Sequence, residues 1–392
     1  VYCEMKLNLP RRMKKRLPEP ERQSMEVNPL PNQVWSMDFM SDALYAGRRF
    51  RTFNVLDEGV REALAIVVDT SIPSGRVIRE LDKLVEWLAT SVKPELVQLT
   101  NSMFLGFARQ LKERLGVPVL CSLQGEDIFL EDLVEPYRTE ARELLRERSQ
   151  DVDGFVATSS TYADFMSDYL SVAREKIHVV PLGISLKGHG ERSNQRKTDS
   201  VTIGYLARIC PEKGLHLLVE AFDTLVGRLG KDRLRLEIAG YLGGRDHAYF
   251  EEIKARISRS NWHDRFRNWG EVDRLQKIDF LSSLDILSVP TVYKDPKGLF
   301  ILEAMANEVA VVQPAHGSFP ELVNATGGGL LVEPGSARVL ADGIQGLVEN
   351  PKERERLAQH GKQAVFEKFS DETLAENLVH VYRQYVPEAN GA

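Results

Sequence analysis

The sequence has few cysteines and no long apolar run. Its three cysteines, Cys3, Cys121 and Cys210, are an odd number without paired spacing, which argues against disulfides and a structural zinc site and for a reducing compartment. The longest apolar stretches, such as residues 63–68, are strand-sized and far shorter than the ~18 residues of a membrane span. The polar, basic N-terminus predicts that there is no signal peptide. We therefore expect a cytoplasmic protein, either free or peripheral at the membrane.

The sequence also has no excess of basic residues. It contains 51 Lys and Arg and 57 Asp and Glu, which gives a net charge of −6. A mildly acidic chain is not a general binder of polyanions. The exception is residues 1–30, which hold seven Lys or Arg, four Asp or Glu and four prolines. Proline at this density blocks helices and sheet ladders, so an extended basic arm is predicted. The arm is interpreted as a solvated tail or, alternatively, as a contact to DNA phosphates.

A length of 392 residues suits two or three domains with cores of their own. Alternating apolar residues predict strands at 34–40, 49–56 and 63–68, joined as an antiparallel meander and followed by a helix over 74–88. From about residue 90 short apolar strands alternate with helical patterns, which indicates parallel sheets covered by helices. In the first half these strands are 96–99, 117–121, 155–157 and 177–180, and the helices are 102–115, 135–149 and 160–171.

After a polar linker at 191–200, the second half repeats this alternation more fully. Its predicted strands are 201–206, 234–239, 265–269, 286–289 and 309–312, and its predicted helices are 213–229, 247–259, 273–283, 299–306 and 318–324. Three amphipathic helices follow at 336–349, 351–368 and 371–386. This pattern predicts a complete doubly wound domain.

Two junctions between a strand and a helix in the second half carry chemistry. The loop after 201–206 brings Arg208 and Lys213 to a helix that starts near Gly214. Two cations beside free backbone N–H groups suit a diphosphate. The alternative is an ordinary surface loop with two exposed cations.

The second junction holds Asp295 and Glu303, eight positions apart, with Gly298 at a helix N-terminus between them. One carboxylate can accept from sugar hydroxyls and the other from a ribose, while the N–H groups of Gly298, Leu299 and Phe300 point at phosphates. Alternatively, Asp295 only caps the helix and Glu303 is a solvated residue on its face.

Together these motifs resemble the retaining glycosyltransferases of the GT-B fold, in particular glycosyltransferase family 4. The resemblance covers about residues 84–386. It rests on Arg208…Lys213-Gly214 and on Asp295-x7-Glu303, supported by the segments 310–323 and 328–334. The fold class expected from it is α/β, with GT-B-like doubly wound Rossmann-type domains.

The resemblance implies roles for individual residues. Arg208 and Lys213 would neutralise the diphosphate of a nucleotide-sugar donor, and Glu303 would hold its ribose. Asp295 would touch the donor sugar as the catalytic acid, although it is one methylene shorter than the usual Glu, which affects donor choice or rate. Gly317 and Ser318 would border the nucleotide. No metal and no cofactor other than the donor is expected, and the acceptor would be an unknown hydroxyl compound.

The first half lacks parts that a complete GT-B N-terminal domain has. The glycine-rich loop is absent, and residues 84–190 match only the later part of such a domain. The usual acceptor-side His is not evident, because Gln124-Gly125-Glu126-Asp127 follows the strand at Cys121. Glu126 and Asp127 either line the cleft or, as the favoured interpretation, form an exposed polar turn.

Residues 1–82 resemble instead the start of the integrase-core domain of insertion-sequence transposases. The resemblance rests on the segments 7–12, 31–40 and 49–57, and Asp38 matches the first of three metal-binding acids. Two-metal phosphoryl transfer requires all three acids, and the sequence lacks the second and third. We therefore expect neither nuclease nor strand-transfer activity.

The sequence therefore predicts a transposase fragment joined to a glycosyltransferase. The leading hypothesis is a retaining transferase that moves a sugar from a nucleotide-diphosphate sugar to a hydroxyl acceptor, impaired by its shortened acceptor domain. The alternatives are a DNA-binding transposase remnant and an inactive fusion product. The predicted parts are a basic arm (1–30), an RNase H-like meander (31–83), a partial N-terminal GT-B domain (84–190), a linker (191–200), a donor-binding domain (201–370) and a helix with a tail (371–392).

Overall fold

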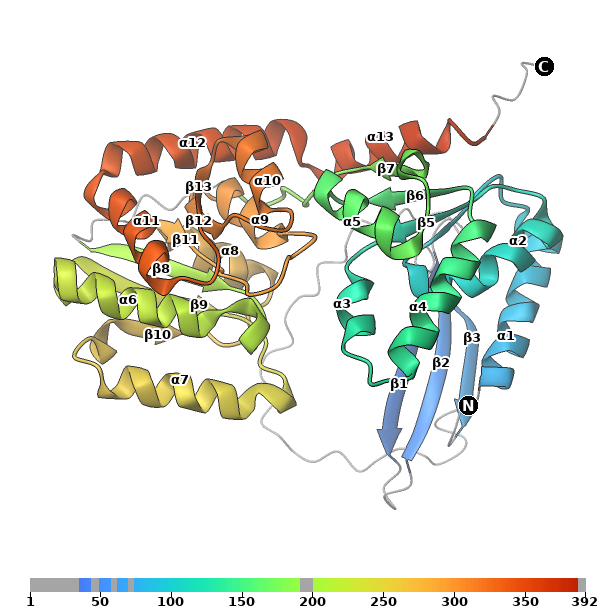
Figure 1. Ribbon diagram of the computed structural model, residues 1–392, viewed down its shortest axis with the longest axis horizontal. Coiled ribbons are helices and arrows are strands. Elements are labelled where there is room, and N and C mark those ends of the chain that lie inside the picture. Colours follow the sequence, from blue (N-terminus) through green and yellow to red (C-terminus); the bar gives the residue numbers. More distant parts are fainter. Residues whose placement is uncertain (1–34, 44–48, 58–61, 70–73, 191–199, 387–392) are drawn as a thin grey trace. The chain divides into compact units, whose positions relative to one another are not determined.

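The computed structural model describes residues 35–43, 49–57, 62–69, 74–190 and 200–386 (Figure 1). The predicted basic arm and nearly all of the predicted linker lie outside these residues. The chain divides into two units. One holds the described residues up to Glu95 together with Gln110–Val117, and the other holds Leu96–Arg109 and the described residues from Pro118 onward. Among the described residues, every helix is too short or too polar to cross a membrane.

The first unit contains the predicted meander. Strands β1 (Trp35–Ala43), β2 (Arg49–Asp57) and β3 (Glu62–Asp69) pair antiparallel in that order. Helix α1 (Ser74–Trp87) follows and ends in a π-helical turn. The side-chain amide of Gln110 donates to Asp82 on α1 at 2.7 Å, and Arg114 forms an ion pair with Glu86. The meander is confirmed, while its RNase H-like character stays a prediction.

The second unit begins with a parallel sheet, which we call the first lobe. Its strands are β4 (Val97–Leu99), β5 (Val119–Leu123), β6 (Gly154–Ala157) and β7 (Ile177–Val179), paired in that order. Its helices are α3 (Glu126–Glu131), α4 (Tyr137–Arg148) and α5 (Ser160–Leu170), while most of α2 (Ala108–Leu115) belongs to the first unit. All residues of β5 and β6 are buried, as expected for central parallel strands covered on both faces.

The rest of the second unit is a six-stranded parallel sheet, the second lobe, with the order β10-β9-β8-β11-β12-β13. The strands are β8 (Val201–Leu206), β9 (Leu234–Ala239), β10 (Phe266–Asn268), β11 (Ile286–Leu287), β12 (Ala310–Pro314) and β13 (Gly329–Val332). The strand order reverses between β8 and β11. In open parallel sheets, ligands bind beyond the carboxyl ends of the strands at such a point.

Helices cover both faces of the second sheet (Figure 1). They are α6 (Leu215–Leu229), α7 (His247–Arg259), α8 (Arg274–Ser282), α9 (Leu299–Ala306), α10 (Phe319–Thr326), α11 (Ala337–Glu349) and α12 (Pro351–Lys368). Helix α6 packs against α7 and α11, and α12 packs against α9 and α10. One continuous apolar core therefore supports both loops that the sequence singles out.

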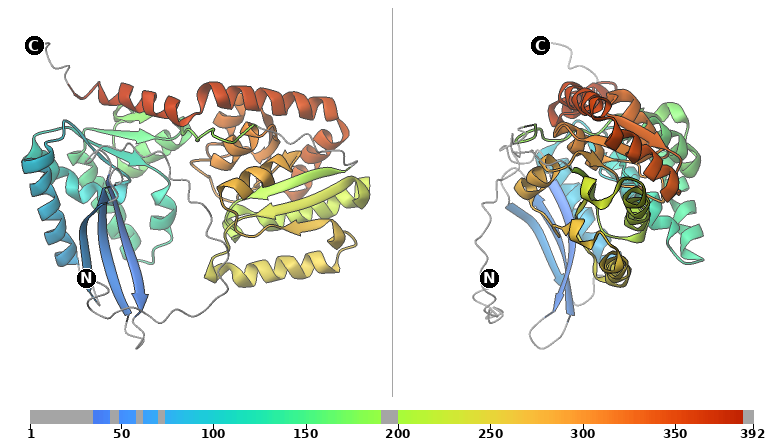
Figure 2. Two further views of the ribbon diagram at one scale, coloured as in Figure 1. Left: turned by 180° about the vertical axis from the view of Figure 1, so that it is seen from behind. Right: turned by 90° about the vertical axis from the view of Figure 1, so that its left-hand side faces the viewer.

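The last helix, α13 (Asp371–Tyr382), does not stay with the second lobe. Its Val381 is buried in a cluster with Leu120, Val156 and Val180 of the first lobe. Figure 2 shows α12 over the second lobe and α13 continuing onto the first. The chain therefore connects the two lobes twice, once through residues 180–200 and once at the junction of α12 and α13.

Candidate functional site

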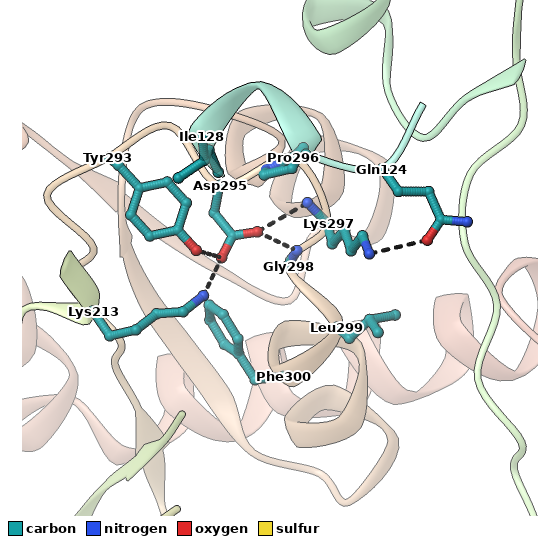
Figure 3. A pocket seen from close by; sticks show the side chains of 11 residues that line it. Gln124, Ile128, Lys213, Tyr293, Asp295, Pro296, Lys297, Gly298, Leu299 and Phe300 are labelled. Atoms are coloured by element: carbon teal, nitrogen blue, oxygen red, sulfur yellow. Dashed lines mark hydrogen bonds and ion pairs between the residues drawn. The ribbon is translucent and has the colours of Figure 1, made fainter. Parts of the chain in front are cut away.

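Asp295 lies in the loop between β11 and α9, and its carboxylate is saturated with hydrogen bonds (Figure 3). Oδ1 accepts from the backbone N–H groups of Lys297 at 2.9 Å and Gly298 at 3.2 Å. Oδ2 accepts from Lys213 Nζ at 2.5 Å and from the Tyr293 hydroxyl at 3.0 Å. Asp295 is only 4% exposed, and burial alone would raise the pKa of its carboxyl group. The charge of Lys213 and these hydrogen bonds outweigh burial and hold the pKa below its usual value.

Lys213 is held in place by the start of α6. It ends the short 3-10 turn Pro211–Lys213, and Gly214 then turns the chain with φ 73°. A Cβ on Gly214 would lie 1.8 Å from the carbonyl oxygen of Pro290, so only glycine allows this approach. The ammonium group lies over the rings of Tyr293 and Phe300, 5.0 and 5.7 Å from their centroids, which adds a cation–π attraction.

The N-terminus of α9 offers free donors. Gly298 caps the helix with φ 61°, and a Cβ there would lie 2.7 Å from Leu322 Cδ1. Among the described residues, the N–H groups of Leu299 and Phe300 have no hydrogen-bond partner. The buried hydroxyl of Ser318 also has none within this part of the chain. Unsatisfied donors at a helix N-terminus suit an anion with several oxygen atoms.

A cavity of about 330 Å³ opens at this point (Figure 3). The second lobe contributes Lys213 and the segment 293–300 without Lys294, and the first lobe contributes Gln124, Gly125 and Ile128. The side chain of Lys297 reaches across and donates to the side-chain oxygen of Gln124 at 3.1 Å. The cavity therefore has cations and backbone donors on one side and an uncharged polar side chain on the other.

The structure brings only some of the predicted site residues to this cavity. Lys213, Asp295, Gly298, Leu299 and Phe300 line it. The four other predicted residues of the second lobe, Arg208, Glu303, Gly317 and Ser318, do not line the cavity.

These four residues lie nearby with contacts of their own. Arg208 donates to the sulfur of Cys210 at 3.3 Å, and Glu303 forms an ion pair with Lys277. Gly317 packs on the backbone of Asp295, while the N–H of Ser318 donates to the Asp295 carbonyl at 2.9 Å, so this pair supports the loop.

Three polar residues that line the cavity were not predicted from the sequence to be functional. They are Tyr293, Lys297 and Gln124. The interpretation of Glu126 and Asp127 as an exposed polar turn is wrong, because both begin helix α3. Glu126 is 6% exposed and accepts from the N–H groups of Ser102 and Gln124. Burial raises the pKa of Asp127, although a hydrogen bond from Tyr162 opposes the shift.

The transposase-like Asp38 lies on β1 at the register position opposite Asn54 of β2, and its side chain is outside the described part of the chain. Within the described residues, no three His, Cys, Asp or Glu side chains gather at a possible metal site. The expectation of a metal-free site stays a prediction.

Two family models match adjoining segments of the chain. The model described as glycosyl transferases group 1 matches residues 190–364, and the model of Glycosyltransferase Family 4 matches residues 49–187. The second match begins well before residue 84, the expected start of this part, and includes β2 and β3.

Curated relatives fall into two groups. The capsular polysaccharide biosynthesis glycosyltransferase CapM of Staphylococcus aureus is 26% identical over 205 residues, which are 51% of this chain and 50% of the relative. A protein of insertion element IS476 from Xanthomonas euvesicatoria is 40% identical over 83 residues, 21% of this chain and 24% of the relative. The chain spans about half the length of the glycosyltransferases that it matches.

Among solved structures, Anabaena HepE in complex with UDP superimposes with a TM-score of 0.68 at 18% identity, covering 80% of this chain and 84% of HepE. The fold of the second unit is therefore GT-B. The IS476 protein supports the resemblance of residues 1–82 to a transposase, because its match covers 83 residues.

Proposed function

We propose that this chain, whose residues 190–364 match the model of the group 1 glycosyl transferases, binds a nucleotide-diphosphate sugar at the N-terminus of α9 and transfers the sugar with retention to a hydroxyl acceptor. The observation that carries the proposal is the arrangement of Lys213 beside the free N–H groups of Leu299 and Phe300 in one cavity. A diphosphate would satisfy these donors and take the place of solvent on Lys213.

The reaction needs charge stabilisation more than proton transfer to the donor. As the bond between the sugar and the diphosphate breaks, negative charge grows on the leaving phosphate. Lys213 and the dipole of α9 are already in place to stabilise that charge, so they would lower the barrier without reorganisation. In this proposal no metal is required, because the chain's own cation and backbone donors neutralise the diphosphate.

The remaining residues take supporting parts in the proposal. Glu303 lies in the second turn of α9 and would accept from the ribose hydroxyls, exchanging its ion pair with Lys277 for that contact. Gln124 faces the cavity from the first lobe, so its amide is placed to orient the acceptor hydroxyl. Because the first lobe has only four strands among the described residues, we propose that transfer is slow.

Calorimetric titration with UDP in the presence of EDTA tests the proposal. HepE was crystallised with UDP, which makes UDP the first nucleotide to try. Lys213→Ala should weaken UDP binding roughly 10- to 100-fold, since a charge-assisted contact is worth about 1.5–3 kcal/mol. Lys254→Ala is the matched control, because Lys254 is an exposed lysine of the same lobe that pairs with Glu251.

Equal UDP affinity of the wild type and Lys213→Ala, with the melting temperature recorded to show that the variant is folded, would reject the diphosphate site. Loss of wild-type binding on addition of EDTA would reject only the metal-free mechanism.

A further inference from the structure

Helix α5 of the first lobe begins with N–H groups that the second lobe satisfies. The first four N–H groups of a helix have no partner within the helix. In α5 the N–H of Tyr162 is satisfied locally by the side chain of the N-cap residue Ser159. Those of Ser160 and Thr161 donate to the carboxylate of Glu321.

Glu321 reaches α5 from α10 of the second lobe, about 160 positions away in the sequence. Its Oε2 accepts from Ser160 N at 2.8 Å, and its Oε1 accepts from Thr161 N at 2.7 Å and from the Thr161 hydroxyl at 2.6 Å. Among the described residues no cation forms an ion pair with Glu321. The positive end of the α5 dipole therefore attracts this carboxylate without a competing ion pair.

The contact lies next to the candidate site. Glu321 follows Ser318 in the chain by three positions, and the N–H of Ser318 holds the carbonyl of Asp295. On the first lobe, Thr158 precedes α5 and its hydroxyl donates to the carbonyl of Pro296 at 2.6 Å. The start of α5 thus contacts the Asp295 loop directly through Thr158 and indirectly through Glu321.

We propose that Glu321 is a positioning residue that latches the first lobe to the second by capping α5, and so sets the gap between Gln124 and the Asp295 loop. Gln124 and Thr158 of the first lobe each make one hydrogen bond to the loop that holds Asp295. Glu321 accepts three hydrogen bonds from the start of α5, where its charge also meets the positive end of the helix dipole. Ser160 and Thr161 are exposed, so separating the lobes here costs a helix cap and these three bonds, which is more than either of the other contacts loses.

The inference concerns the distance between lobes, and only its effect on turnover rests on the proposed function. Glu321→Gln keeps the shape of the side chain but has one acceptor oxygen, so it cannot serve both N–H groups. Thr161→Val removes the hydroxyl donor and leaves both N–H groups. Glu353→Gln is the matched control, since Glu353 lies in the first turn of α12 and pairs with Arg356 within its own lobe.

The full chain is measured by small-angle X-ray scattering, by hydrogen exchange of peptides covering 158–170, and by UDP calorimetry. Glu321→Gln should increase the radius of gyration, speed exchange at the start of α5 about tenfold or more, and leave UDP affinity within about twofold. Thr161→Val should show a smaller effect. Because both act on one contact, the double variant should be no more open than Glu321→Gln alone.

The scattering result separates a latch from a simple helix cap, because a cap affects α5 without moving a lobe. A radius of gyration equal to that of Glu353→Gln, in a variant that melts cooperatively, would overturn the latch. If the wild type fails to bind UDP while Glu321→Gln still opens the lobes, the proposed function is wrong and the latch stands.

Discussion

At the scale of single residues, Asp295 unites two interpretations that the sequence leaves as alternatives. Its Oδ1 accepts from the N–H groups of the turn before α9, as a structural aspartate does, while its Oδ2 faces Lys213 and Tyr293 in the cavity. The shorter side chain explains this, since an aspartate accepts from the N–H groups two and three residues further on more readily than a glutamate. The carboxylate is thus fixed at the site by the same contacts that begin α9.

The Asp295→Asn variant should show how strongly Lys213 depends on Asp295. The amide retains an oxygen for the backbone N–H groups but turns an N–H₂ donor toward Lys213 and Tyr293. A buried ammonium group without its counter-charge should cost about 3 kcal/mol of unfolding free energy, measured by urea denaturation. Asp295→Asn combined with Lys213→Met should recover most of this loss. If the double variant is no more stable than Asp295→Asn, the ion pair is not what stabilises the loop.

Transfer activity gives the complementary measurement on Asp295. If its carboxylate contacts the donor sugar as the charge develops, Asp295→Ala should lower turnover by about 10²-fold or more, and Asp295→Glu should keep or raise it. If Asp295 acts only as a cap, Asp295→Ser should preserve turnover, because serine is also a good cap. Turnover of UDP-glucose, recorded with the melting temperature of each variant, distinguishes these results.

Five of the residues around the cavity follow from motif spacing in the sequence, because Lys213 and the turn at 295–300 belong to local strand–helix junctions. Gln124 could not be predicted in the same way. It meets Lys297 across 173 positions, and only the approach of the two lobes makes that contact. Tyr293 lies two positions before Asp295. This closeness in the sequence is the one feature that could have predicted Tyr293 as a site residue.

At the scale of elements, the start of α9 depends on a glycine. Gly298 has φ 61°, and a Cβ there would clash with Leu322. Gly298→Ala should therefore shift the N–H groups of Leu299 and Phe300 and weaken UDP binding at least tenfold, with a loss of about 1–3 kcal/mol of stability. Gly335→Ala is the control, since Gly335 also has positive φ but nothing lies within 4 Å of its Cβ position. Equal UDP affinity of the two variants would contradict the role of the α9 N-terminus.

The helices and strands were largely predictable from periodicity, with two informative exceptions. Helix α3 has six residues, too few for a 3.6-residue period to show, and its Glu126 is buried by tertiary contacts that the sequence does not reveal. Strand β13 lies within the segment 328–334, which supports the family resemblance but was not predicted as a strand. Gly329 is in that strand because a Cβ would lie 2.4 Å from Val311 on β12, a packing reason invisible in the sequence.

The segment between the lobes contains a buried histidine whose protonation should weaken the fold. Nδ1 of His189 lies 2.7 Å from the Asn307 amide nitrogen, which requires a neutral imidazole that accepts. Burial, aided by the Arg274 and Lys277 charges, lowers the pKa of His189 to about 4. The unfolded state then binds more protons than the folded state between about pH 6.5 and 4, so stability falls as the pH falls through this window.

We expect His189 to account for about 2 kcal/mol of the stability lost between pH 7 and pH 4.5. The neutral variant His189→Gln should lose correspondingly less on acidification, measured by urea denaturation at both pH values. The exposed His263 provides the control, because His263→Gln also replaces a histidine but leaves the buried contact between His189 and Asn307 intact. Parallel acid curves for the wild type and His189→Gln would show that His189 does not titrate with unfolding.

At the scale of the whole molecule, the sequence predicts a join between two parts of different origin near residue 84. The antiparallel sheet β1–β3 shares no strand pairing with the parallel sheets among the described residues, which agrees with two origins. The Family 4 model nevertheless matches from residue 49, inside this meander. Apolar alternation reports that strands exist and not which sheet they join, so the predicted boundary near residue 84 stays a prediction.

Helix α13 offers a test of whether the first lobe depends on the end of the chain. Val381 of α13 is 5% exposed and packs on Leu120, Val156 and Val180 in the first lobe. Val381→Ala should remove about 2 kcal/mol of packing, the transfer term of two methyl groups plus a small cavity. Val379→Ala is the matched control on the same helix, because Val379 is 43% exposed.

Hydrogen exchange should become faster in β5 and β6 of the Val381→Ala variant and stay unchanged in β8 and β12. Equal protection in Val381→Ala and Val379→Ala would mean that α13 contacts the first lobe without stabilising it.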